Sequence, residues 1–157
     1  MVKINIVAVG RIKEKYFLEA LKEYQKRLAR FCEFSIIEVA EENYVKTDDE
    51  IIERIKLKEE ENVLPKLKGY IFATAIEGKK YSSNAFAKRL KNLIDEGKGV
   101  ITFVIGGSYG MTDKIKKSAN ELISFSDMTF PHTFFRVMLT EQIYRAFCIN
   151  AGTPYHK

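Results

Sequence analysis

The spacing of apolar residues changes repeatedly along the chain, and each change predicts a new element. Short runs of β-branched and apolar residues alternate with longer stretches in which apolar residues recur every three or four positions. The first pattern is typical of strands and the second of amphipathic helices. Strands are expected over residues 2–9, 34–39, 70–76, 100–105 and 122–125. Helices are expected over residues 12–31, 47–65, 82–97 and 131–150, with a short one beginning near residue 112.

Residues of special backbone preference mark several helix ends. Thr47-Asp48-Asp49-Glu50 fits a capping box at the start of the second helix. Ser82 or Ser83 can cap the third helix. Pro65 should end or kink the second helix, and Pro131 stands where the first turn of the last helix is expected.

The strand at residues 100–105, Val-Ile-Thr-Phe-Val-Ile, shows no alternation of apolar and polar positions. This pattern predicts a strand that is buried on both faces, as in a parallel sheet with helices on each side. Together with the alternation of strands and helices, it predicts one α/β domain over residues 1–157, built as a parallel-sheet α/β/α sandwich. Ligands bind such sheets beyond the C-terminal ends of the strands.

The composition suits a globular domain, with 46% hydrophobic and 30% charged residues. No stretch is long and apolar enough to span a bilayer. The first residues begin directly as a strand and lack the zones of a signal peptide. Cys32 and Cys148 form no metal or redox spacing, so two free core thiols in a cytoplasmic protein are expected.

The net charge of +5 favours a polyanionic partner without proving one. Acidic residues dominate positions 41–61, where a solvated helix face is the preferred interpretation. Cations gather on and just before the first helix, where they either grip a nucleic-acid backbone or form a second solvated face. They are Arg11, Lys13, Lys15, Lys22, Lys26, Arg27 and Arg30.

Three loops that follow predicted strands are candidate ligand sites: residues 74–78, 105–110 and 125–130. Gly106-Gly107 would let the backbone approach a ligand closely, although a glycine loop after a strand also serves as a tight turn. The spacing is neither the G-x-G-x-x-G of dinucleotide sites nor a phosphate loop, which would need Gly-Lys-Ser/Thr. Kinase-like and GTPase chemistry is therefore disfavoured.

The last helix and the residues after it hold further polar groups. His132 and Arg136 are four residues apart and share a helix face, and Glu141 and Arg145 have the spacing of an ion pair. With two histidines and no clustered cysteines or carboxylates, a metal site is not expected. The final Tyr155-His156-Lys157 carries groups that an active-site tail would need, and is equally compatible with a merely soluble tail.

Four segments resemble a known family when they are taken together and in order. They are KINIVAVGRIKEKY (3–16), FVIGGSYG (103–110), SFSDMTFPHTFFRVMLTEQIYRAF (124–147) and YHK (155–157). The chain is similar over its whole length to the bacterial RlmH family, the SPOUT-class methyltransferases of a 23S rRNA pseudouridine. The resemblance implies S-adenosyl-L-methionine as cofactor, no metal, and a C-terminal trefoil knot, which is a rare exception to the unknotted rule.

The resemblance also assigns residues. It implies that Thr74 and Gly106 contact the cofactor, although the family often has a larger apolar residue where Thr74 stands. It implies a homodimer in which the tail of one subunit reaches the cofactor pocket of the other. The residues that would wrap the cofactor are Phe125, Ser126, Asp127, Met128, Thr129 and Phe130.

The implied reaction is methylation of N3 of a pseudouridine in helix 69 of 23S rRNA, within the assembled ribosome. The N3 proton must leave, and we expect His156 or Tyr155 to handle it or to orient the base. His132 and Arg136 are expected to engage RNA phosphate or the negative charge that develops on the base. Two alternatives stay open: a SPOUT methyltransferase that acts on tRNA, and a ribosome-binding factor without catalysis.

Overall fold

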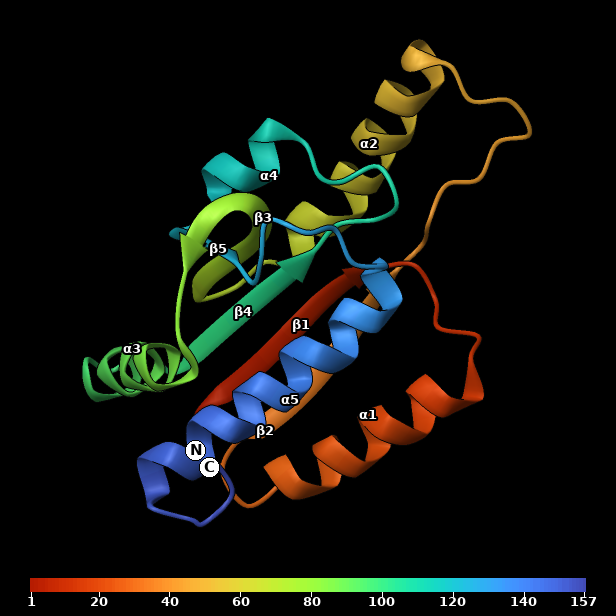
Figure 1. Ribbon diagram of the computed structural model, residues 1–157. Coiled ribbons are helices and arrows are strands. Elements are labelled where there is room, and N and C mark those ends of the chain that lie inside the picture. Colours follow the sequence, from red (N-terminus) through yellow and green to blue (C-terminus); the bar gives the residue numbers. More distant parts are fainter.

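The computed structural model describes residues 1–157 and contains one parallel five-stranded sheet (Figure 1). The strands lie in the order β2-β1-β4-β3-β5, so the two most apolar strands, β1 and β4, pair near its centre. Their bounds are β1 (Lys3–Val9), β2 (Glu33–Val39), β3 (Tyr70–Lys80), β4 (Val100–Ile105) and β5 (Glu121–Ser124). The predicted parallel α/β/α sandwich is confirmed, while the trefoil knot stays a prediction.

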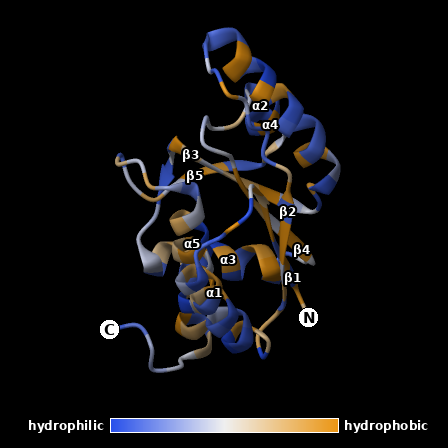
Figure 2. Ribbon diagram, turned by 90° about the vertical axis from the view of Figure 1, so that its right-hand side faces the viewer, coloured by the Kyte–Doolittle hydropathy of each residue, from blue (hydrophilic) through white to orange (hydrophobic).

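Helices cover both faces of this sheet, and none of them is both long and apolar enough to cross a membrane. On one face lie α1 (Lys15–Leu28), α3 (Ser83–Asp95) and α5 (His132–Ala151). On the other lie α2 (Asp49–Val63) and α4 (Asp113–Ser118). The strands between them are predominantly hydrophobic, whereas α2 alternates hydrophobic and hydrophilic residues (Figure 2).

Strand β4 shows why the unbroken apolar pattern appears in the sequence. Phe103 packs into the larger core under α1, α3 and α5, where its ring stacks on that of Phe72 with 4.9 Å between centroids. The next residue, Val104, faces the smaller core under α2 and α4. Both faces of the strand are therefore buried, so neither accepts charged side chains.

Two helix starts lie one residue later than predicted. The capping residue of α2 is Asp48, whose carboxylate accepts a hydrogen bond of 2.9 Å from the Ile51 amide, so the Thr47 capping box is wrong. The cap and the amide that it bonds both lie one residue further along than in the predicted box, because a helix cap bonds the amide three residues after it. Pro131 is itself the extended residue that precedes α5, and His132 is its first helical residue. As predicted, α2 ends before Pro65, which lies in a 3₁₀ turn at Leu64–Lys66.

Strand β3 is longer than predicted and is interrupted. It pairs with β4 only over Tyr70–Ala73. Along β5, both Thr74 and Lys79 stand opposite Ile123, so residues 75–78 leave the ladder as a loop. In Figure 1 this segment curls away from the sheet next to β5. The interruption opens space at the C-terminal ends of β3, β4 and β5.

Candidate cofactor-binding site

A cavity of about 760 Å³ lies at these strand ends, within the size range of small-molecule sites. Its walls are the three loops that the sequence marked as candidates, joined by the start of α5. Its apolar lining includes Ile76, Ile105, Phe125, Phe130 and Phe135. The parallel sheet therefore places its cavity where ligands of such sheets bind.

The first loop is shaped where β3 parts from β4. The Thr74 hydroxyl donates a hydrogen bond of 2.9 Å to the carbonyl of Val104, the last β4 residue that pairs with β3. Further on, Gly78 lies directly against β5, where an added Cβ would stand 2.6 Å from the Ile123 amide nitrogen. Thr74 thus lines the cavity and also holds the point of divergence.

The glycines of the second loop allow close packing of the protein against itself. An added Cβ on Gly106 would lie 2.9 Å from the carbonyl carbon of Gly110, which has a φ of +82°. On Gly107 it would lie 3.0 Å from both Glu59 and Val9. The loop is a tight turn, and Gly106 and Gly107 both line the cavity, so the two roles foreseen for the loop coincide.

The third loop, residues 125–130, is held by its own side chains and by Lys80. The Ser126 hydroxyl accepts a hydrogen bond of 3.0 Å from the Met128 amide, and the Phe125 ring packs against Phe135 with centroids 4.7 Å apart. Asp127 does not line the cavity, because its carboxylate pairs with the Lys80 ammonium at 2.5 Å. The residues of this loop that line the cavity are Phe125, Ser126, Met128, Thr129 and Phe130.

His132 and Arg136 share a helix face as expected, and that face turns toward the sheet. His132 lines the cavity, with its Nε2 3.9 Å from a carboxylate oxygen of Glu41. Arg136 is only 1% exposed. Its guanidinium donates to Glu38 at 2.5 Å and to the Gly10 carbonyl at 3.2 Å. It is not presented to an RNA phosphate here, because α5 packs onto the strand ends that hold these acceptors.

The residues after α5 fold back onto the same helix and do not line the cavity of their own chain. The Tyr155 hydroxyl donates to Glu141 at 3.0 Å, and the His156 Nδ1 lies 3.1 Å from the Arg145 guanidinium. The expected Glu141–Arg145 pair is present, at 2.7 Å. Glu141 and Arg145 lie nine and thirteen residues along α5 from His132, roughly 14 and 20 Å along the helix axis. The chain ends beside the C-terminal half of this helix (Figure 1).

A buried carboxyl group lies behind the glycine turn. Glu59 of α2 is 3% exposed and approaches Gly107, and its carboxylate accepts a hydrogen bond of 3.4 Å from the Glu42 amide. Burial raises the pKa of Glu59 to about 7, and the nearby charges of Glu41 and Glu42 raise it as well. The neighbouring Glu60 accepts a hydrogen bond of 2.5 Å from Thr112.

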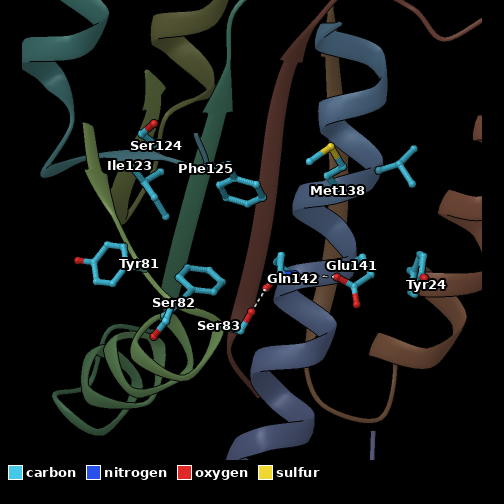
Figure 3. Close-up of a pocket in the computed structure, with 12 residues that line it drawn as sticks. Tyr24, Tyr81, Ser82, Ser83, Ile123, Ser124, Phe125, Met138, Glu141 and Gln142 are labelled. Carbon is cyan, nitrogen blue, oxygen red and sulfur yellow. Dashed lines mark hydrogen bonds between the residues drawn. The ribbon is translucent and has the colours of Figure 1, made fainter. Parts of the chain in front are cut away.

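A second cavity of about 410 Å³ adjoins the first (Figure 3). It lies between β5 and α3 on one side and α5 on the other, with Tyr24 of α1 at its edge. Ile123, Ser124 and Phe125 contribute to both cavities. The polar groups of α5 here are Glu141 and Gln142, and Gln142 accepts a hydrogen bond of 2.9 Å from Ser83.

The sequence did not single out Lys116. This residue of α4 lines the first cavity and pairs with Glu77 of the first loop at 2.7 Å. It is one of three lysines in a six-residue helix, and no motif distinguishes it from Lys114 or Lys117. Met111, Pro131 and Phe135 also line the cavity without having been identified from the sequence.

The expected cofactor, S-adenosyl-L-methionine, fits the chemistry of the first cavity. Its purine is flat and apolar on both faces, which matches walls of isoleucine and phenylalanine. The ribose carries hydroxyl groups and the methionine part is charged, and the cavity contains Glu77 and Lys116 as well as hydroxyl groups of Ser126 and Thr129. The residues present therefore suit both parts of the molecule.

Comparison with known proteins gives a consistent result. A family model described as "Predicted SPOUT methyltransferase" matches residues 2–156. Curated proteins named ribosomal RNA large subunit methyltransferase H, from Lactobacillus helveticus and Levilactobacillus brevis, are each 50% identical, with 98% of this chain and 99% of the relative covered.

Solved structures share the fold at low sequence identity. A probable methylase family protein from Haemophilus influenzae gives a TM-score of 0.54 at 10% identity, covering 99% of this chain and 70% of that one. A tRNA (m1G37) methyltransferase from Aquifex aeolicus gives 0.50 at 14% identity, covering 92% and 69%. With the family match spanning nearly every residue, the chain belongs to the SPOUT methyltransferases, which use S-adenosyl-L-methionine as methyl donor.

Proposed function

We propose that this enzyme methylates N3 of a pseudouridine in helix 69 of 23S rRNA, with the assembled ribosome as substrate. The observation that carries the proposal is 50% identity, over 98% of the chain, to proteins named ribosomal RNA large subunit methyltransferase H. The net charge of +5 also favours a ribosomal substrate, because ribosomal RNA is a polyanion. Under this proposal the enzyme acts in the cytoplasm.

The first cavity is the proposed cofactor site. Thr74, Gly106 and the loop at 125–130 hold the cofactor, and Asp127 contributes by fixing that loop through Lys80. When bound, S-adenosyl-L-methionine supplies a methyl group activated by its sulfonium. The protein must then place the nucleophilic nitrogen in line with that methyl group and accept the N3 proton.

Tyr155 and His156 are the proposed groups for handling that proton or orienting the base. Because they pack against Glu141 and Arg145 and do not line their own cavity, the proposal requires a homodimer in which they complete the partner's site. The outward side of α5 supports this arrangement. It carries a partly exposed apolar stripe of Phe134, Val137 and Met138, in which Phe134 stacks on Phe17 of α1 and the other two line the second cavity. Such a stripe favours cover by another surface.

The two remaining residues act at the mouth of the cavity. His132 lines it and can meet the RNA or the charge that develops on the base. Arg136 holds the helix that carries His132 in place, because its hydrogen bonds to Glu38 and Gly10 tie the start of α5 to the ends of β2 and β1. We therefore assign Arg136 a positioning role, since direct contact with RNA would require it to leave these buried partners.

The cations of α1 are the proposed grip on the rRNA backbone. Lys22 and Lys26 are exposed on one side of this helix. Reversing both charges should weaken binding to ribosomes and reduce its dependence on salt, since each phosphate contact releases counterions. Unchanged methylation at physiological salt would instead identify the helix as a solvated face.

The test of the function is methyl transfer from labelled S-adenosyl-L-methionine to ribosomes that lack the modification, with free 23S rRNA and bulk tRNA in parallel. Label at N3 of a helix 69 pseudouridine in assembled ribosomes is the expected result. Label in tRNA alone would overturn the substrate but keep the enzyme class. Absence of both label and cofactor binding would favour the ribosome-binding factor.

A further inference from the structure

The first cavity contains one ion pair in an otherwise neutral wall. Apart from His132, Glu77 and Lys116 are the ionisable residues among those that line it. They come from different elements, the loop that interrupts β3 and the helix α4, and they meet at 2.7 Å. The Lys116 side chain is 27% exposed and that of Glu77 57% exposed, so the pair lies at the mouth of the cavity with the lysine as its more buried member.

The fold does not depend on this pair. Helix α4 is anchored by its capping residue Thr112 and by the buried Ile115. The loop is fixed by Thr74 at one end and by the close contact of Gly78 with β5 at the other. A single solvent-accessible ion pair adds little to stability, so these anchors suffice.

The pair complements one part of the cofactor. The amino-acid end of S-adenosyl-L-methionine carries an ammonium and a carboxylate on the same carbon, whereas its adenosine is uncharged. The Lys116 ammonium lowers the pKa of the Glu77 carboxyl through their hydrogen bond, which favours the ionised carboxylate. When a zwitterion binds, its carboxylate can pair with Lys116 and its ammonium with Glu77. Every charge then keeps an opposite charge as its neighbour.

We propose that Lys116 and Glu77 form the subsite for the amino-acid end of the cofactor, with Lys116 binding its carboxylate and Glu77 its ammonium. This inference rests on the cofactor site proposed above. Lys114 and Lys117 of the same helix are exposed and do not line the cavity. Position in the fold, rather than charge alone, therefore selects Lys116.

Calorimetric binding of two ligands tests the subsite. S-adenosylhomocysteine carries the amino-acid end, whereas 5′-methylthioadenosine has the same nucleoside and sulfur without it. Lys116→Met should weaken binding of the first about tenfold, the scale of a charge-assisted hydrogen bond, and leave the second unchanged. Glu77→Gln should act in the same direction, and Lys117→Met should bind both ligands as the parent does.

Thermal melting of each variant confirms that it is folded. Equal losses for both ligands would show that the pair only holds the loop and α4 together. No loss for either ligand would show that the pair does not contribute to cofactor binding. Each result overturns the subsite. Failure of the parent to bind either ligand would instead overturn the cofactor site itself.

Discussion

Arg136 is the largest side chain that the fold buries completely. Its two terminal nitrogens have acceptors in Glu38 and Gly10, while its Nε has no partner. A buried guanidinium is tolerated only where such acceptors offset its loss of hydration. Here the acceptors belong to the ends of β1 and β2, so the residue couples α5 to the sheet edge at which the cavity opens.

Replacing Arg136 should therefore destabilise the protein. Arg136→Met leaves the Gly10 carbonyl without this donor, but Glu38 is half-exposed and can be hydrated, so we expect a loss of about 2–3 kcal/mol. Urea denaturation measures this change. Arg54→Met is the matched control, because its pair with Glu50 is exposed and should contribute about 0.5 kcal/mol or less. Equal effects of both substitutions would contradict the coupling role.

Glu59 should make stability depend on pH. Its folded pKa of about 7 lies above the ordinary value of 4.5, so the folded chain binds this proton more tightly than the unfolded chain. The stabilisation is complete below about pH 4.5 and is lost as the pH rises through about 7. Its full size is roughly 2 kcal/mol, after allowance for partial hydration.

Melting temperatures measured across this pH range test the expectation. Wild type should lose stability relative to Glu59→Gln as the pH rises, because the amide never ionises. Glu61→Gln, an exposed carboxyl of the same helix, is the control. A difference between wild type and Glu59→Gln that stays constant with pH would refute the assignment.

At the level of elements, the cavity exists because β3 is interrupted between its two pairings with β5. Pairing with β4 stops at Ala73, and the loop at 75–78 crosses the edge of the sheet before pairing with β5 resumes. The arrangement requires that the returning chain lie against the backbone of β5. Only a residue without a Cβ allows this contact, which explains Gly78.

Gly78→Ala should damage both this element and the site. Its Cβ would stand 2.6 Å from the Ile123 amide nitrogen, so either β5 or the loop must move. We expect a loss of about 1–3 kcal/mol and weaker cofactor binding, measured by thermal melting and calorimetry. Gly99→Ala is the control, since its Cβ would meet nothing within 4 Å. Normal cofactor affinity in Gly78→Ala would show that the shape of this loop does not determine cofactor binding.

At the level of the whole molecule, α5 carries groups of opposite function at its two ends. The cavity and His132 lie at its start, whereas Tyr155 and His156 follow its last residue and pack back against Glu141 and Arg145. A two-fold dimer that pairs antiparallel helices would bring each end next to the complementary end of the partner. The apolar stripe of Phe134, Val137 and Met138 suits such a contact.

Mixing two inactive variants tests the shared site. His156→Ala should lower turnover yet leave cofactor binding nearly intact, and Ala75→Trp should block the cavity that Ala75 lines. Random mixing gives about half mixed dimers, each with one intact site, so about a quarter of wild-type methylation should return. Light scattering checks that both variants still dimerise. If the mixture remains inactive, Tyr155 and His156 do not complete the partner's site.

The order of elements, the parallel sandwich and the three cavity loops could all be predicted from the sequence. These features follow from local signals, namely apolar spacing, helix caps and loops placed after strands. Because parallel strands end at one edge, three separate loops could be expected to meet there. Thr74, Gly106 and most of residues 125–130 accordingly line the cavity.

Only the tertiary structure decided which way the remaining groups face. Arg136 turns into the sheet, Asp127 pairs outward with Lys80, and Lys116 rather than Lys117 enters the cavity. Each of these outcomes depends on partners from 39 to 126 positions away, as the pairs Lys116–Glu77 and Arg136–Gly10 show. Side-chain periodicity identifies the face that a residue occupies, but packing between distant elements determines what that face meets.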